Sequence, residues 1–174
     1  MRDALRHALD AYDARRTALL DEIASVPDVL HAVRSDPGRW SILEITEHLA
    51  LAEREVLRGL PDPARLVPQS RSLASGLRRR MLKGILTSRI RVGTPSAGMS
   101  PTGGRSLHEI RALWNENMVW LAAHIEEASD ERLAEAVFAH PVSGPLTTAE
   151  VLWLADLHLQ RHWDQIRALR DSSG

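Results

Sequence analysis

Three segments of this sequence begin with the same helix-start signal, a Ser or Thr followed three residues later by Glu. In such a capping box the two side chains accept hydrogen bonds from backbone N–H groups that have no partner inside the helix. The pairs are Ser41 with Glu44, Ser106 with Glu109, and Thr147 with Glu150. Together with the apolar spacing that follows each signal, they predict helices over about residues 41–58, 106–128 and 147–170.

A fourth helix is predicted at the start of the chain, over about residues 2–25, and Pro27 marks its end. Its apolar residues recur at helical spacing, at Leu5, Leu9, Tyr12, Leu19 and Ile23. No segment alternates apolar and polar residues long enough for a convincing strand, and aromatic residues make up only 4% of the chain. The sequence therefore predicts an all-α fold.

A long connection, about residues 60–105, separates the second and third main helices. It exceeds the usual helix–helix connection in a bundle. Its first part, from Leu73 to Ile90, has helical spacing of its own, at Leu73, Leu77, Met81 and Ile85, and residues 92–105 are rich in Gly, Pro and Ser. At 174 residues we expect a single domain over residues 1–174, a four-helix bundle with a long crossover between the second and third main helices.

Composition excludes some chemistry. The chain has no cysteine, so neither a disulfide nor a protein thiol can take part, and any sulfur chemistry needs a thiol from outside. The net charge is -1, and no run approaches the 18 or so apolar residues of a membrane span. The first residues carry frequent charges and lack the apolar core of a signal peptide, so we expect a cytoplasmic location without a membrane partner.

Three histidines are candidate metal ligands. His158 and His162 lie four residues apart on the inward stripe of the last helix, and His48 lies on the inward stripe of the second. Imidazoles at i and i+4 can bind one metal ion, and a facing helix can supply a third ligand while a coordination position stays open. The alternative is a set of buried histidines that are only hydrogen-bonded, since an H-x-x-x-H pair also arises by chance.

The C-terminal segment AHPVSGPLTTAEVLWLADLHLQRHWDQI carries more than the histidine pair. It resembles the DinB-like (YfiT-like) superfamily of metal-dependent enzymes in its HP-x-x-G-x-L-T turn, its H-x-x-x-H pair and the Gln-Ile that follows. The matching residues are His140-Pro141, Gly144, Leu146-Thr147, His158, His162 and Gln165-Ile166. The upstream signature of the same family matches Trp40-Ser41, Glu44 and His48-Leu49. The resemblance covers about residues 5–170 and is weak in the crossover.

This resemblance implies a four-helix bundle with a divalent metal held by His48, His158 and His162. Members of the superfamily include metal-dependent thiol transferases and thiol-dependent isomerases. It therefore implies an enzyme that transfers a low-molecular-weight thiol to a small electrophilic substrate in stress or detoxification. Imidazole ligands suit several metals, and zinc or nickel is the expected ion. The rival interpretations are a non-catalytic metal-binding or interaction protein of the same fold, and a metal-hydroxide hydrolase. A homodimer is expected, although the sequence does not indicate its surface.

Other polar residues have structural interpretations. Glu44 lies one turn before His48, but its capping box accounts for it. Asp156 points away from His158 on the helix. Asn117 is expected to make a structural hydrogen bond, and His124 lies two turns beyond it without an assigned role. His140 is expected to pack in its turn, and His7, His31 and His108 are expected to be solvated.

The crossover is basic, because residues 71–105 contain no acidic residue. Between Arg71 and Arg105 at its two ends, its charged residues are Arg78, Arg79, Arg80, Lys83, Arg89 and Arg91. They could form a solvated face of a helix whose apolar side docks on the bundle, or a seat for the carboxylates of an anionic ligand. A nucleic-acid surface is not expected, since aromatic residues are not interleaved and no DNA-binding motif is present.

Overall fold

The computed structural model describes residues 1–57, 67–88 and 96–172. Four long helices form the bundle: α1 (Arg2–Ala24), α3 (Ile42–Val56), α5 (Leu107–Glu127) and α7 (Thr148–Ser172). Both α1 and α3 pack against α5 and α7. These four helices correspond to the four predicted from the sequence, so the four-helix bundle is confirmed.

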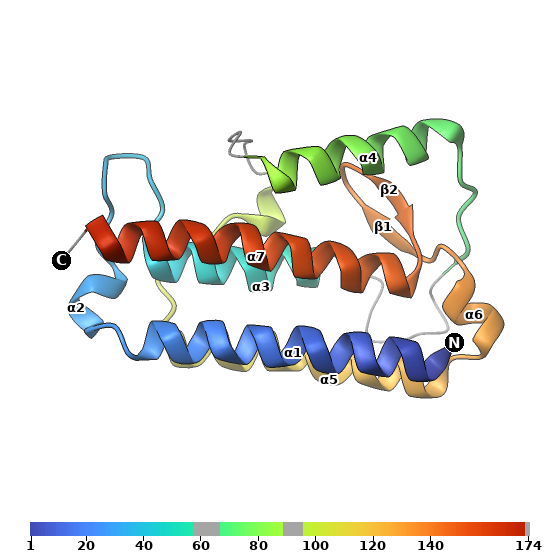
Figure 1. The fold of residues 1–174 in the computed structure, drawn as a ribbon, viewed down its shortest axis with the longest axis horizontal. Coiled ribbons are helices and arrows are strands. Elements are labelled where there is room, and N and C mark those ends of the chain that lie inside the picture. Colours follow the sequence, from blue (N-terminus) through green and yellow to red (C-terminus); the bar gives the residue numbers. More distant parts are fainter. Residues whose placement is uncertain (58–66, 89–95, 173–174) are drawn as a thin grey trace.

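The direction of the helices explains the long crossover. Figure 1 shows that α1 and α7 run in one direction and α3 and α5 in the other. Because α3 and α5 are neighbours that run the same way, the chain has to return to the starting end of α3 before α5 can begin. A short turn cannot make that return.

The predicted capping boxes form at all three helix starts. The Ser41 hydroxyl accepts from the Glu44 N–H, and the Ser106 hydroxyl accepts from the Glu109 N–H. In return, each Glu carboxylate accepts a hydrogen bond from the backbone N–H of its serine. Thr147 and Glu150 make the equivalent pair, at 3.3 and 2.9 Å. These bonds lie within one turn of chain, so the local sequence is enough to place the helix starts.

The core lies between the four helices. The stripe predicted for α1 is buried at all five positions. Opposite it the most deeply buried large side chains include Ile45, Trp114, Leu121 and Leu159. Each helix turns an apolar face inward, as the spacing of three and four residues predicts.

Smaller elements occupy the ends and one side of the bundle (Figure 1). They are α2 (Asp28–His31), α4 (Leu73–Thr87), the 3₁₀ helix η2 (Ala97–Met99), α6 (Asp130–Ala134), β1 (Phe138–His140) and β2 (Gly144–Leu146). The two strands pair antiparallel, with His140 opposite Gly144. This hairpin contradicts the expectation that no strand forms: three-residue strands are too short to show alternation, and Gly144 supplies the positive φ of +76° after the turn.

The crossover helix α4 forms, but with a different face inward than predicted. Leu73, Leu77 and Met81 of the predicted stripe are exposed, while Ser75 and Leu82 are buried. Polar contacts orient the helix: Arg79 forms an ion pair with Glu150 and donates to the carbonyl of Pro145. The prediction that the apolar stripe of this helix docks on the bundle was therefore wrong for Leu73, Leu77 and Met81.

The basic residues of α4 have separate surroundings. Lys83 lies over the ring of Trp153, at 5.9 Å from its centroid, and Arg78 and Arg80 are exposed. Ile90, Arg89 and Arg91, which the sequence analysis included, lie outside the described residues. Among the described helices, none is long and apolar enough to cross a membrane.

Candidate metal centre

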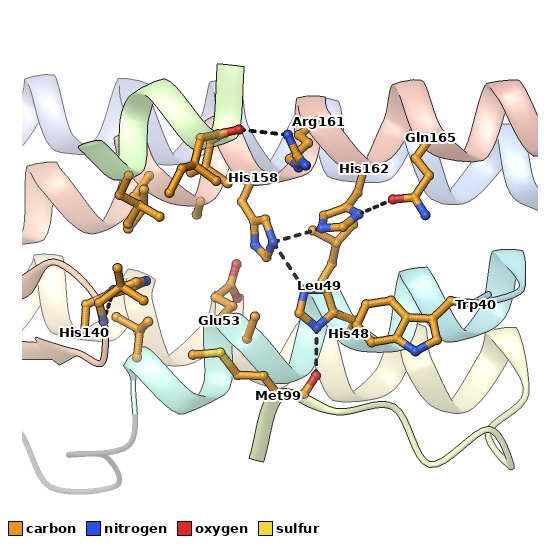
Figure 2. A pocket seen from close by; sticks show the side chains of 18 of the residues that line it. Trp40, His48, Leu49, Glu53, Met99, His140, His158, Arg161, His162 and Gln165 are labelled. Carbon is orange, nitrogen blue, oxygen red and sulfur yellow. Dashed lines mark hydrogen bonds between the residues drawn. The ribbon is translucent and has the colours of Figure 1, made fainter. Parts of the chain in front are cut away.

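Three histidine side chains from two helices meet inside the bundle. His48 comes from α3, and His158 and His162 come from adjacent turns of α7 (Figure 2). The Nε2 atom of His158 lies 3.3 Å from the Nε2 of His48 and 3.0 Å from the Nε2 of His162. One ligand atom from each of the three lies within 4.8 Å of the other two. The structure thus brings together all three residues that the sequence singles out.

Hydrogen bonds on the far side of two rings select their tautomers. His48 donates from Nδ1 to the carbonyl oxygen of Met99, at 2.7 Å, and His162 donates from Nδ1 to Oε1 of Gln165, at 3.0 Å. A neutral ring that carries its proton on Nδ1 has a lone pair on Nε2. Both rings therefore aim a lone pair at the point where the three nitrogens converge, which is the arrangement of metal-ligating histidines.

The spacing of these nitrogens fits a metal ion. Zinc–nitrogen bonds of about 2.0–2.1 Å in tetrahedral geometry separate two ligand nitrogens by about 3.3–3.4 Å. The two measured separations, 3.3 and 3.0 Å, are close to this value. An all-imidazole donor set suits zinc, nickel, cobalt and copper. The three residues could therefore hold one divalent ion and leave a coordination position open.

Burial keeps the three rings neutral, which is the form that binds metal. It lowers the pKa of His162 to about 3, with a further contribution from His48. Burial also lowers the pKa of His158 well below its usual value and lowers that of His48, where the bond to Met99 acts in the opposite direction.

A buried carboxylate fixes the loop that carries Met99. Glu47 accepts from the backbone N–H groups of Thr102 and Gly103 and from the Thr102 hydroxyl, at 2.8 to 3.2 Å, and it forms an ion pair with Arg105. These contacts hold the residues after η2 against α3. The Met99 carbonyl that binds the His48 ring lies three residues before this anchor, so we expect the anchor to help position it.

The triad forms part of the wall of a cavity of about 430 Å³. Most of its remaining wall is apolar and comes from α3, α4 and α7, with side chains that include Leu82, Leu86, Val151 and Leu154. Trp40 packs beside His48, with 4.7 Å between ring centroids, and Arg39 also lines the cavity. A cavity of this size accommodates a small molecule.

Glu53 is a second buried polar group in the cavity wall. Its Oε2 accepts from the Tyr12 hydroxyl at 2.6 Å and from Trp114 Nε1 at 3.2 Å, and no described residue gives Oε1 a partner. Burial is the main cause that raises the pKa of Glu53. The sequence does not point to Glu53 as a site residue, because nothing in its spacing distinguishes it from the charged residues of an exposed face.

Several structural interpretations are confirmed. Glu44 caps α3 and forms an ion pair with Arg34, and Asp156 is bound by Arg15 of α1. Asn117 donates to the carbonyl of Ala50 and lies away from the triad's hydrogen bonds.

The remaining histidines divide into exposed and buried ones. His7 and His108 are exposed as expected, whereas the expectation for His31 was wrong: it is buried, with Nε2 2.9 Å from the carbonyl oxygen of Ile23. This contact joins the short helix α2, which carries His31, to the last turn of α1. His124 is fully buried, stacks on Trp120 and contacts Thr148.

Comparison with known proteins agrees with this architecture. A four-helix bundle with three inward histidines on its second and last main helices defines a class of candidate metal-binding bundle proteins. The family model of the DinB superfamily matches residues 8–166, and the chain belongs to that superfamily. The crystal structure of TT2238, described as a four-helix bundle protein, is similar with a TM-score of 0.53 and 21% identity. The alignment covers 97% of this chain and 99% of that one, and at this identity it supports the fold alone. No curated protein matches the chain.

Proposed function

We propose that this protein is a divalent-metal-dependent enzyme that transfers a low-molecular-weight thiol to an electrophilic substrate, with His48, His158 and His162 as the metal ligands. The observation that carries the proposal is the convergence of three Nε2 atoms, two of them with lone pairs selected by their partners, on one wall of an apolar cavity. Zinc or nickel is the proposed ion.

The chain's own residues supply the binding and the exclusion of water. The three imidazoles hold the ion, and the Met99 carbonyl and Gln165 orient two of them. A divalent ion with an open position lowers the pKa of a bound thiol, so that the thiolate is available at neutral pH. The apolar wall would receive the electrophile and keep bulk water away from it.

The absence of cysteine agrees with a thiol that comes from solution. The proposal includes a role in stress or detoxification, a cytoplasmic location and a homodimer, all of which remain predictions. A metal-hydroxide hydrolase would use the same ligands without a thiol. A non-catalytic metal-binding or interaction protein would have the metal and no turnover.

The first experiment measures metal content by elemental mass spectrometry on untagged protein. We expect about one divalent ion per chain in the natural sequence and loss of that ion in His48→Ala and in His162→Ala. His108→Ala, which changes an exposed histidine outside the triad, is the control and should retain the metal. Retention of the metal in both triad variants would show that the ion is bound elsewhere.

The second experiment tests turnover on the metal-loaded protein. A chloro-dinitroarene is supplied with glutathione, mycothiol or bacillithiol, and thiol-dependent consumption is followed. We expect a rate that disappears in His162→Ala. Hydrolysis of an activated ester without any thiol would favour the hydrolase instead. A flat rate with every thiol and every ester, on protein that holds its metal, would favour the non-catalytic alternative.

A further inference from the structure

His140 lies at the end of β1, before Pro141, and its ring is fixed by the turn that follows. The backbone N–H groups of Val142 and Ser143 both donate to its Nδ1, each at 3.1 Å. A nitrogen that accepts two N–H groups carries no proton itself. The single proton of the neutral ring is therefore on Nε2, which makes this nitrogen a donor without a lone pair in the ring plane.

The ring stays neutral at physiological pH. Burial lowers the pKa of His140 to about 4. The two backbone bonds depend on the position of Val142 and Ser143 in the hairpin turn between β1 and β2, so the ring has little freedom to rotate. The result is a hydrogen-bond donor with a fixed direction and no net charge.

His140 belongs to the wall of the same cavity as the histidine triad. His140 lines the cavity together with His158, and Figure 2 shows it to one side of the triad, across the part of the cavity bordered by the apolar side chains. No residue that the structure describes accepts a bond from its Nε2. An apolar ligand alone would leave this N–H without a partner, at a cost comparable to a lost hydrogen bond.

We propose that the Nε2–H of His140 anchors the ligand of this cavity by donating to an acceptor oxygen, such as that of a carbonyl or carboxylate. The inference rests on the proposed function and deepens it, because it names the substrate class: a small molecule with an apolar body and an acceptor oxygen placed away from the metal-proximal end. His140 is a binding residue in this scheme, and the metal does not depend on it.

The tautomer is tested directly by NMR of protein labelled with ¹⁵N in histidine. We expect His140 to show an unprotonated Nδ1 and a protonated Nε2 from about pH 5 upward. A proton on Nδ1, or an imidazolium ring at pH 7, overturns the inference. In the same metal-free sample 2-hexanone, an apolar ketone without a thiol, is added, and we expect the Nε2–H resonance to shift; an unchanged resonance at saturating ketone overturns it too.

Binding to the zinc-loaded protein is tested with two matched series of probes, by calorimetry. One series consists of straight-chain alkanethiols, and the other of mercapto methyl esters of the same chain lengths. We expect the ester of at least one length to bind about ten-fold more tightly than its alkanethiol, as one additional hydrogen bond provides. Equal affinities at every length would contradict the inference.

Two variants assign the difference to His140. His140→Asn keeps an acceptor for the Val142 N–H, as in an Asx turn, but has no donor at the position of Nε2. It should fold, hold zinc and lose the preference for the ester. Ser143→Ala is the control, because it lies in the same turn and its hydroxyl has no partner among the described residues; it should keep the preference. A preference that survives in His140→Asn overturns the inference.

The proposed function and this inference fail separately. If neither series of thiols binds to the zinc-loaded protein, the thiol-transfer proposal fails, and the ketone titration still decides the role of His140. If the thiols bind but His140→Asn retains the ester preference, the metal site stands and the anchoring role is wrong.

Discussion

At the scale of single residues, the orientation of two imidazole rings determines what the candidate metal site offers. His162 aims Nε2 into the site because its Nδ1–H is taken by Gln165, one turn further along α7. Partners of this kind set the tautomer and the basicity of a ligand, and their loss costs metal affinity although they never touch the ion.

Gln165→Ala is therefore expected to weaken zinc binding by about 10- to 100-fold without unfolding the protein. Competition with a chromophoric chelator measures the affinity. Gln160→Ala is the matched control: Gln160 lies on the same helix, is exposed, and its side-chain amide donates to Asp156 rather than to a residue of the triad. Equal affinities in the two variants would show that the Gln165 contact does not orient His162.

Glu53 is a buried carboxyl group in the wall of the cavity, and burial is the main cause that raises its pKa. Its pKa is raised above 4.5, so the folded protein holds this proton more tightly than the unfolded chain does. The stabilisation from this proton is fully present below the unfolded pKa and is lost as the pH rises through the folded pKa. Above that range the buried carboxylate is charged and destabilising.

Glu53→Gln removes this titration while keeping an oxygen for Tyr12 and Trp114. We expect the difference in the free energy of unfolding, variant minus natural protein, to increase as the pH rises above about 4.5. The gain should be about 1.4 kcal/mol per pH unit until the folded pKa is reached. Urea unfolding at several pH values measures it. A constant difference across this range would mean that Glu53 is already charged in the folded protein.

At the scale of elements, the crossover links α3 to α5 and also carries the Met99 carbonyl that binds His48. The segment from η2 to α5 is held on α3 by Glu47, which is 1% exposed and accepts from Thr102, Gly103 and Arg105. Because Met99 lies just before this anchor, the metal site and the crossover are coupled through one buried carboxylate.

Glu47→Ala leaves Arg105 and two backbone N–H groups without their acceptor. Because Arg105 is 35% exposed and can be solvated, the main cost is the N–H groups that lose their acceptor, and we expect a loss of about 1–3 kcal/mol in the free energy of unfolding together with weaker zinc binding. Glu116→Ala is the control, since its ion pair with Arg54 is exposed and should contribute at most about 1 kcal/mol. If zinc binding is unchanged in folded Glu47→Ala, the loop does not orient His48.

At the scale of the whole molecule, five histidines whose pKa is lowered by burial make the bundle sensitive to acid. Burial lowers the pKa of each of them: His48, His124, His140, His158 and His162. Their folded-state pKa values are below the unfolded value of about 6.5. The stability that their neutral forms permit is present above pH 6.5 and is lost as the pH falls toward their folded pKa values.

The metal-free protein is therefore expected to lose stability progressively below about pH 6.5, by about 1.4 kcal/mol per pH unit for each histidine that remains neutral in the fold. His124→Gln should reduce the steepness of this loss, because His124 keeps a folded pKa of about 4 and lies outside the metal site. Chemical unfolding followed by circular dichroism from pH 7.5 to 4.5 measures the slope. An identical slope in the variant would exclude His124 from the effect.

The sequence by itself determined the four main helices, their capped starts and the shared face of His158 and His162. These features depend on interactions within one or two turns of chain, such as the bonds between Thr147 and Glu150, and so they can be read from local spacing. The inward stripe of the second helix also indicated His48 as a candidate third ligand, and the family resemblance pointed to the same residue.

Only the tertiary structure decided which side chains from different elements meet. The bonds of His48 to Met99 and of Glu53 to Tyr12 join residues 51 and 41 positions apart, and no local pattern encodes them. The same holds for the inward face of α4, where an ion pair to Glu150 accompanies an apolar stripe that is mostly exposed. It also holds for the position of His140 in the cavity wall. The physical reason is that contacts between elements depend on how whole surfaces pack, whereas residue spacing specifies only the face that each helix can offer.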